Sequence, residues 1–146
     1  MILDLKKLKS GGKESENFYF EYFPECRFGD IPSVELVPPV KITGSVTLTG
    51  KHSAYTEGEA EFTLAGCCTG CLSDTEKTYT VDFAEEVSEN NPDGYSVVND
   101  KIDLKNIVDD AVLINFPIKF LCKEDCKGIC AGCGANLNSE ECKCEK

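Results

Sequence analysis

The sequence of 146 residues has little of what usually identifies an enzyme or a membrane protein. Its one histidine, His52, lies in a polar linker, and no glycine-rich phosphate loop or G-x-S-x-G nucleophile motif is present. No segment approaches the roughly 20 apolar residues that a membrane helix needs. The sequence has 26 acidic and 15 basic residues, and its net charge of −11 argues against nucleic-acid binding through charge alone. We therefore expect an acidic protein that is not an enzyme.

The N-terminal residues also lack the pattern of a secretory signal. Asp4 interrupts the apolar stretch after Met1, where a signal peptide needs an unbroken one. We therefore expect a cytoplasmic protein whose thiols are kept reduced.

Cysteine is the residue that the sequence has in excess, with ten in 146 residues. Cys26 stands alone, and we expect it to be a small buried hydrophobe. The others gather at two places in the sequence, which are Cys67, Cys68 and Cys71, and then Cys122, Cys126, Cys130, Cys133, Cys142 and Cys144. Clustered, reduced cysteines at short spacings indicate metal ligands before disulfides.

Hydrophobic periodicity predicts the fold. Apolar and polar residues alternate over 40–49, 59–64 and 78–83, a pattern typical of half-buried strands, and the short links favour antiparallel neighbours. Asp103 is placed to cap a helix whose apolar residues recur at helical spacing from Leu104 to Val112, and Pro117 stops it. The predicted fold class is α+β, an antiparallel β meander packed with one amphipathic helix, plus a cysteine-rich C-terminal metal-binding tail.

We expect two parts, with a sheet and helix domain over 1–117 and a zinc-binding tail over 118–146 docked on it. Lysines and acidic residues balance in the tail, so the whole net charge lies in residues 1–117. The tail has too few large apolar residues to fold alone, and metal would supply what the core lacks.

The strongest motif is Cys130-Ala131-Gly132-Cys133-Gly134, because two thiolates separated by two residues can bind one ion. The glycine after Cys133 allows a tight left-handed turn that aims backbone N–H groups at sulfur. Cys142 and Cys144 follow closely and would complete a tetrahedral site of four cysteines.

A second pair, Cys68 and Cys71, needs two more ligands, because two cysteines do not close a structural zinc site. Cys122 and Cys126 are the candidates, since the first site does not need them. Cys67 is an alternative to Cys68, and unliganded or redox-active thiols are an alternative to metal. Disulfide exchange is disfavoured, because the motif lies between strands and not at the start of a helix.

These motifs resemble the YceD family, the large ribosomal RNA subunit accumulation proteins of bacteria and plastids. The resemblance rests on Cys68-x-x-Cys71-Leu72, on the segment from Leu121 to Cys130, and on Cys133-Gly134-x-Asn136-Leu137-Asn138 with Cys142-x-Cys144. It spans roughly residues 40–146, and the cysteine-rich ending resembles the Gram-positive branch. Thr69-Gly70 and Ala131 depart from the family pattern without removing a ligand. The resemblance implies a role in the synthesis, processing or stability of 23S ribosomal RNA, and no catalytic residues.

Two zinc sites of four thiolates would move the formal charge to about −15. We therefore expect a basic protein partner, such as a ribosomal protein or a processing enzyme, in preference to bare RNA. Two other functions remain open from the sequence. One is a rubredoxin-like iron electron carrier, since four thiolates also hold iron, and the other is a zinc-gated thiol redox switch.

Overall fold

The computed structural model describes residues 1–24, 31, 33–92 and 94–145, and Cys26 lies outside the described residues. The chain runs through eight elements, which are β1 (Ile2–Asp4), α1 (Leu5–Ser10), β2 (Ser15–Tyr22), β3 (Val34–Gly50), β4 (Ser53–Cys67), β5 (Asp74–Ser88), β6 (Lys101–Asp103) and α2 (Leu104–Ile114). Most of the described secondary structure is antiparallel sheet, and the C-terminal segment is rich in cysteine, as the sequence predicted.

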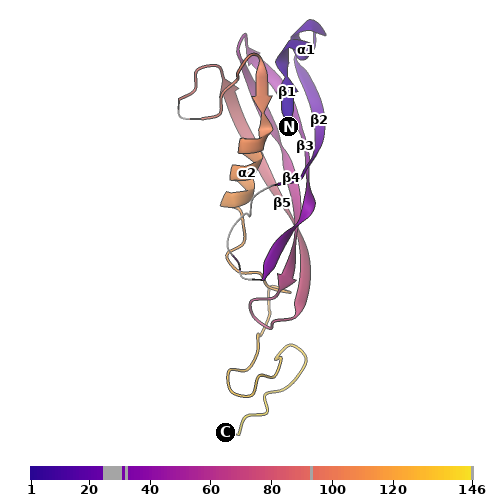
Figure 1. Cartoon of the computed structure of the whole chain (residues 1–146), viewed down its shortest axis with the longest axis vertical. Helices are drawn as coiled ribbons and strands as arrows, with labels where there is room; N and C mark the ends of the chain where they lie inside the picture. The colour runs from indigo at the N-terminus through magenta and orange to yellow at the C-terminus, as the bar shows by residue number, and fades with distance from the viewer. Residues whose placement is uncertain (25–30, 32, 93, 146) are drawn as a thin grey trace.

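The larger sheet is a meander in which the strands lie in the order β2-β3-β4-β5 (Figure 1). Neighbouring strands pair antiparallel in a register that opposes Ile42 to Ala60 and Ala60 to Val81. All three side chains are buried, while Lys41, Glu61 and other alternate residues are exposed. The period-two pattern therefore describes a sheet with one buried and one solvent-facing surface.

A second sheet has two strands, β1 near the N-terminus and β6 directly before α2, which pair antiparallel. Each of its strands passes directly into a helix that an aspartate caps. Asp4 accepts a hydrogen bond from the Lys6 amide at 2.9 Å, and Asp103 accepts one from the Lys105 amide at 3.0 Å. The expectation of one helix was therefore incomplete, because the described residues contain both α1 and α2. Residues 1–35 had no helical periodicity long enough to predict α1, which has six residues.

The core lies between the inner face of the larger sheet and α2. The helix buries Leu104, Ile107, Val108 and Val112 against the sheet. Phe120, which follows the helix, is fully buried in the same core. Among the described residues, no helix has both the length and the apolar character needed to span a bilayer.

The C-terminal segment after Phe120 contains no helix or strand among its described residues, and only an isolated bridge joins Ile129 to Asn136. It extends from the end of the meander where the β4–β5 turn lies (Figure 1). Such a segment offers little apolar surface to bury, so its shape must be held by turns and by the cysteines.

Candidate metal centres

The structure brings the eight cysteines of the two predicted sites into two separate groups of four. The inner cluster consists of Cys68, Cys71, Cys122 and Cys126. The terminal cluster consists of Cys130, Cys133, Cys142 and Cys144. Within each cluster the sulfur atoms all lie within 4.8 Å of one another.

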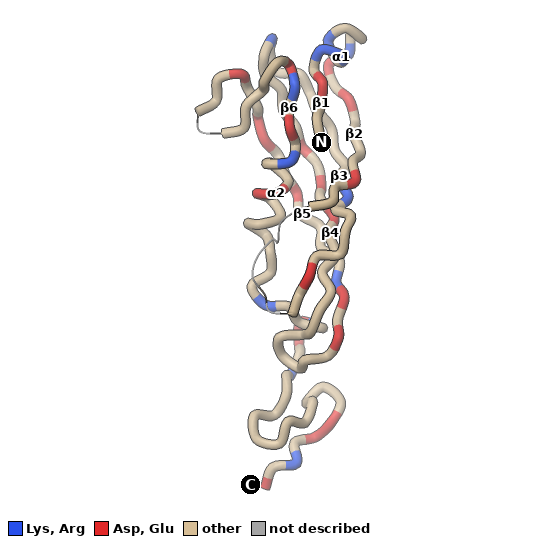
Figure 2. Tube along the Cα trace, in the orientation of Figure 1, with Lys and Arg blue, Asp and Glu red and all other residues tan. Residues whose placement is uncertain are grey.

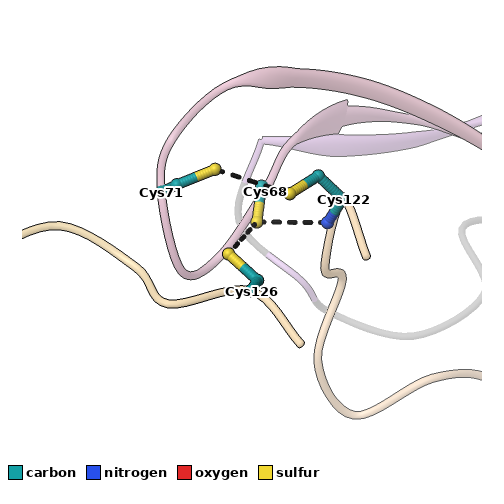
Figure 3. Close-up of side chains that lie close together, drawn as sticks. All are labelled: Cys68, Cys71, Cys122 and Cys126. Atoms are coloured by element: carbon teal, nitrogen blue, oxygen red, sulfur yellow. Dashed lines mark hydrogen bonds between the residues drawn. The ribbon is translucent and has the colours of Figure 1, made fainter. Parts of the chain in front are cut away.

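The inner cluster joins two distant parts of the chain (Figure 3). Cys68 and Cys71 come from the turn between β4 and β5, and Cys122 and Cys126 come from the segment after Phe120. The Sγ atoms of Cys68 and Cys126 are 3.7 Å apart, and those of Cys71 and Cys122 are 3.6 Å apart. Tetrahedral zinc with Zn–S bonds of about 2.3 Å requires sulfur atoms about 3.8 Å apart, so the inner cluster fits such an ion.

Backbone hydrogen bonds hold the two parts of the inner cluster together. The Thr69 amide donates to the Phe120 carbonyl at 2.7 Å, and the Thr69 hydroxyl donates to the same oxygen at 3.2 Å. The Cys68 amide donates to the Ser73 carbonyl at 2.9 Å, which closes the turn that carries Cys68 and Cys71. The core anchor at Phe120 therefore also positions Cys122 beside the β4–β5 turn.

The electrostatics of the inner cluster favour a thiolate at Cys68. Burial raises the pKa of Cys68, but backbone N–H groups directed at its sulfur outweigh burial and lower the pKa from 9.0 to about 6. The amides of Cys122 and Gly70 donate to this sulfur at 3.2 and 3.4 Å. Burial and the neighbouring thiols instead raise the pKa of Cys122 to about 12. A cation would favour the charged form of all four sulfurs, since a metal ligand must be deprotonated.

The terminal cluster repeats this arrangement within one short segment. The Cys130 sulfur lies 3.4 Å from that of Cys142 and 3.5 Å from that of Cys144. Gly134 has a φ of +74°, so the left-handed turn expected after Cys133 is present. Backbone N–H groups of Cys133 and Gly132 lower the pKa of Cys130 to about 6. Hydrogen bonds to the neighbouring thiols Cys142 and Cys130 raise the pKa of Cys144 to about 12.

The two clusters differ in their exposure to solvent. Cys68 and Cys71 are buried, whereas Cys133, Cys142 and Cys144 are exposed. The inner cluster takes its cysteines from the β4–β5 turn and the tail, whereas all four cysteines of the terminal cluster come from the tail. The chemistry of the donors is the same in both, and it suits zinc or iron.

Two asparagines orient ligands of the inner cluster, and the sequence analysis did not assign them this role. The Asn138 side chain donates to the Cys126 sulfur at 3.4 Å and accepts from the Lys127 amide at 2.9 Å. Asn136 donates to the Ser73 hydroxyl at 3.4 Å, and Ser73 also accepts from the Cys71 thiol. Partners of this kind fix the direction of a metal ligand. The only sequence signal for them was their place in the resemblance to YceD.

Cys67, the alternative to Cys68, is outside both clusters, and its sulfur lies 3.8 Å from the Asp74 carboxylate. His52 is also outside both clusters, and its Nδ1 faces Glu89 at 3.6 Å and Asp100 at 3.8 Å. Neither residue belongs to a candidate metal site among the described residues.

An antiparallel meander whose β4–β5 turn and C-terminal segment together form two four-cysteine clusters defines a small cysteine-rich β protein. The model of the family described as "Large ribosomal RNA subunit accumulation protein YceD" matches residues 56–146, which include both clusters. The chain therefore belongs to the YceD family.

Curated relatives match over shorter stretches. An uncharacterized protein of Mycobacterium tuberculosis (strain ATCC 25618 / H37Rv) is 32% identical over 109 residues, which cover 68% of this chain and 48% of the relative. The chain thus spans about half the length of this relative and of two further mycobacterial relatives that it matches equally well. The Arabidopsis thaliana protein "Large ribosomal RNA subunit accumulation protein YCED homolog 1, chloroplastic" is 41% identical over 44 residues, 30% of this chain and 14% of that protein. No solved structure matches.

Proposed function

We propose that this protein is a non-enzymatic accessory factor in the synthesis, processing or stability of 23S ribosomal RNA, and hence in large ribosomal subunit biogenesis. The observation that carries the proposal is the family match over residues 56–146. The matched region contains β5, α2 and both cysteine clusters, so it covers the parts that build the candidate sites.

Two structural zinc ions, one in each cluster, would hold the C-terminal segment. Four sulfur donors at tetrahedral spacing leave no open position for a substrate, which is typical of a structural and not a catalytic zinc site. In the terminal cluster, zinc binding and folding would be one event, because three of its four cysteines are exposed and none of the four lies in a helix or strand that the structure describes.

The partner we propose is a basic protein, such as a ribosomal protein or an RNA-processing enzyme. The net charge of −11 becomes about −15 with two zinc tetrathiolates, and phosphate groups would be repelled by such a surface. Complementary charge instead speeds the encounter with a basic protein.

Depletion of the protein in its host tests the function. Mature 23S ribosomal RNA should fall relative to 16S, and the wild-type chain should restore the ratio. Cys68→Ser should fail to restore it, whereas Cys67→Ser, one residue away and outside the clusters, should restore it. An unchanged 23S to 16S ratio on depletion would refute the proposed role.

A further inference from the structure

The larger sheet ends on one side in a long edge strand. β5 has 15 residues and pairs with β4 along its whole length, but it has no strand partner on its other side among the described residues. An unpaired strand edge presents a row of backbone N–H and C=O groups and is a template for another strand.

The register identifies the residues whose backbone groups face outward. The Val97 amide donates to the Ser88 carbonyl at 3.0 Å, so Ser88 faces away from β4 and ends the open part of the edge. Because alternate residues of an antiparallel strand face the same side, the outward groups belong to Glu76, Thr78, Thr80, Asp82, Ala84 and Glu86. Within the described residues, no backbone hydrogen bond joins any of them to a neighbour outside β4.

The side chains of these residues lie on the exposed face of the sheet, and this face is acidic. Asp82 lies directly opposite Glu59, although like charges opposite each other destabilise a sheet. Figure 2 shows acidic residues along β4 and β5, with the lysines mainly at α1, around β6 and in the C-terminal segment. No described cation forms an ion pair with Asp82 or Glu86.

The opposite edge of the sheet differs in length and charge. β2 has eight residues, and its outward residues are Ser15, Asn17, Tyr19 and Glu21, with one acidic side chain that accepts a hydrogen bond from Tyr19. A second copy of the chain is a poor occupant for β5, because pairing two β5 edges would bring acidic side chains together.

We propose that the open edge of β5 docks an extended basic segment of a protein partner, which adds to the sheet as a further strand. Backbone hydrogen bonds to the outward groups supply affinity, and basic side chains at alternate positions pair with Glu76, Asp82 and Glu86. The inference rests on the proposed function for its protein partner, and it specifies how that partner binds.

Amide hydrogen exchange of the full chain tests the docking mode, with a short peptide of alternating lysine and threonine as the probe. The peptide should slow exchange at the amides of Thr78, Thr80 and Asp82. The same peptide with alternate N-methylated backbone nitrogens should not, because it lacks the donors and the strand geometry. Protection of β2 or of the C-terminal segment, or no protection along β5 when binding is saturated, would overturn the proposal. Protection of β5 that rises with protein concentration alone would assign the edge to a second copy and overturn it as well.

Proline variants separate the two edges. Thr80→Pro removes an outward N–H without breaking the β4–β5 pairing, and it should weaken peptide binding by about tenfold or more. Asn17→Pro makes the same change on the β2 edge and should leave binding unchanged.

Asp82→Lys tests the charge without altering the backbone. It should raise the melting temperature, since it removes the repulsion with Glu59, and yet weaken peptide binding. A variant that is destabilised, or that binds the peptide as the wild type does, would contradict the role of this face. If Thr80→Pro and Asp82→Lys both restore 23S ribosomal RNA in depleted cells, the docking mode is wrong while the proposed function stands. An unchanged ratio on depletion instead refutes the function itself.

Discussion

Gly132 lies against the sulfur of Cys144, and a Cβ atom at this position would come within 2.6 Å of that Sγ. The inner cluster repeats the relationship, because a Cβ at Gly70 would come within 3.0 Å of the Cys126 sulfur. In both motifs, Cys68-Thr69-Gly70-Cys71 and Cys130-Ala131-Gly132-Cys133, the glycine directly precedes the second cysteine. Glycine is therefore needed here for close approach, and its position lets the last cysteine of each cluster reach the other three.

Replacing this glycine should open the cluster. In Gly132→Ala the new methyl group displaces Cys144, so we expect the terminal cluster to lose at least tenfold in zinc affinity, as seen when groups supporting a metal site are removed. Gly70→Ala should weaken the inner cluster less, because its contact is 3.0 Å instead of 2.6 Å. Competition with a chromophoric chelator measures both. Ala131→Ser, at an exposed neighbouring position, is the control, and equal affinities for it and for Gly132→Ala would contradict the packing argument.

Metal removal should loosen the tail and spare the sheet. The meander and α2 bury their apolar faces against each other, whereas the terminal cluster would depend on the proposed zinc site, and a structural zinc site contributes on the order of 10 kcal/mol or more. With a strong chelator, amide exchange should accelerate over residues 122–145 and in the turn 68–73. Unchanged exchange in the tail would show that packing and not metal holds it, and collapse of β3, β4 and β5 would show a sheet that depends on metal.

Phe120 should link the tail to the core. Phe120→Ala removes a fully buried ring and should lower the free energy of unfolding by about 3–5 kcal/mol. It should also weaken the inner cluster, because Thr69 binds the carbonyl of residue 120. Ile118→Ala is the matched control, since this side chain is 94% exposed and its loss should change stability by less than about 0.5 kcal/mol. Denaturant unfolding compares them, and equal losses in the two variants would refute the anchor.

Acid should release the metal from the terminal cluster first. The pKa values of Cys68 and Cys130 are lowered to about 6, so their contribution is present at higher pH and is lost as the pH falls through that value. Bound metal competes with protons and moves the release to still lower pH. Since Cys133, Cys142 and Cys144 are exposed, we expect their zinc to appear in a dye assay before that of the inner cluster. Cys130→Ser, which should keep only the inner ion, should lack the earlier release at higher pH. Release of both ions in one step from the wild type would contradict this order.

Local patterns predicted much of this structure. Alternation located β3, β4 and β5, and Asp103 was expected as the cap of the helix that proved to be α2. The same reasoning began the predicted strand at Val40, whereas β3 begins at Val34 and passes through Pro38 and Pro39, with a register shift between Val37 and Lys41. Proline is a strong signal against a regular strand, and only the sheet context shows how an irregularity accommodates it.

The grouping of the cysteines was also predictable, because spacing and the need for four ligands leave few combinations. The sequence did not predict which side chains support the sulfur atoms. The roles of Asn138 and of the Phe120 anchor depend on contacts across the tail and with the β4–β5 turn, and these arise only once the chain has folded.

The central claim is that each cluster binds one zinc ion, and elemental analysis of the purified full chain tests it most directly. We expect two zinc ions per chain, a colourless protein, and one zinc ion in each of Cys68→Ser and Cys130→Ser. The Cys67→Ser control should keep both ions. Iron with absorbance in the visible range would contradict zinc and favour an electron carrier. A chain without metal, or a loss of both ions from either single variant, would contradict two independent structural sites.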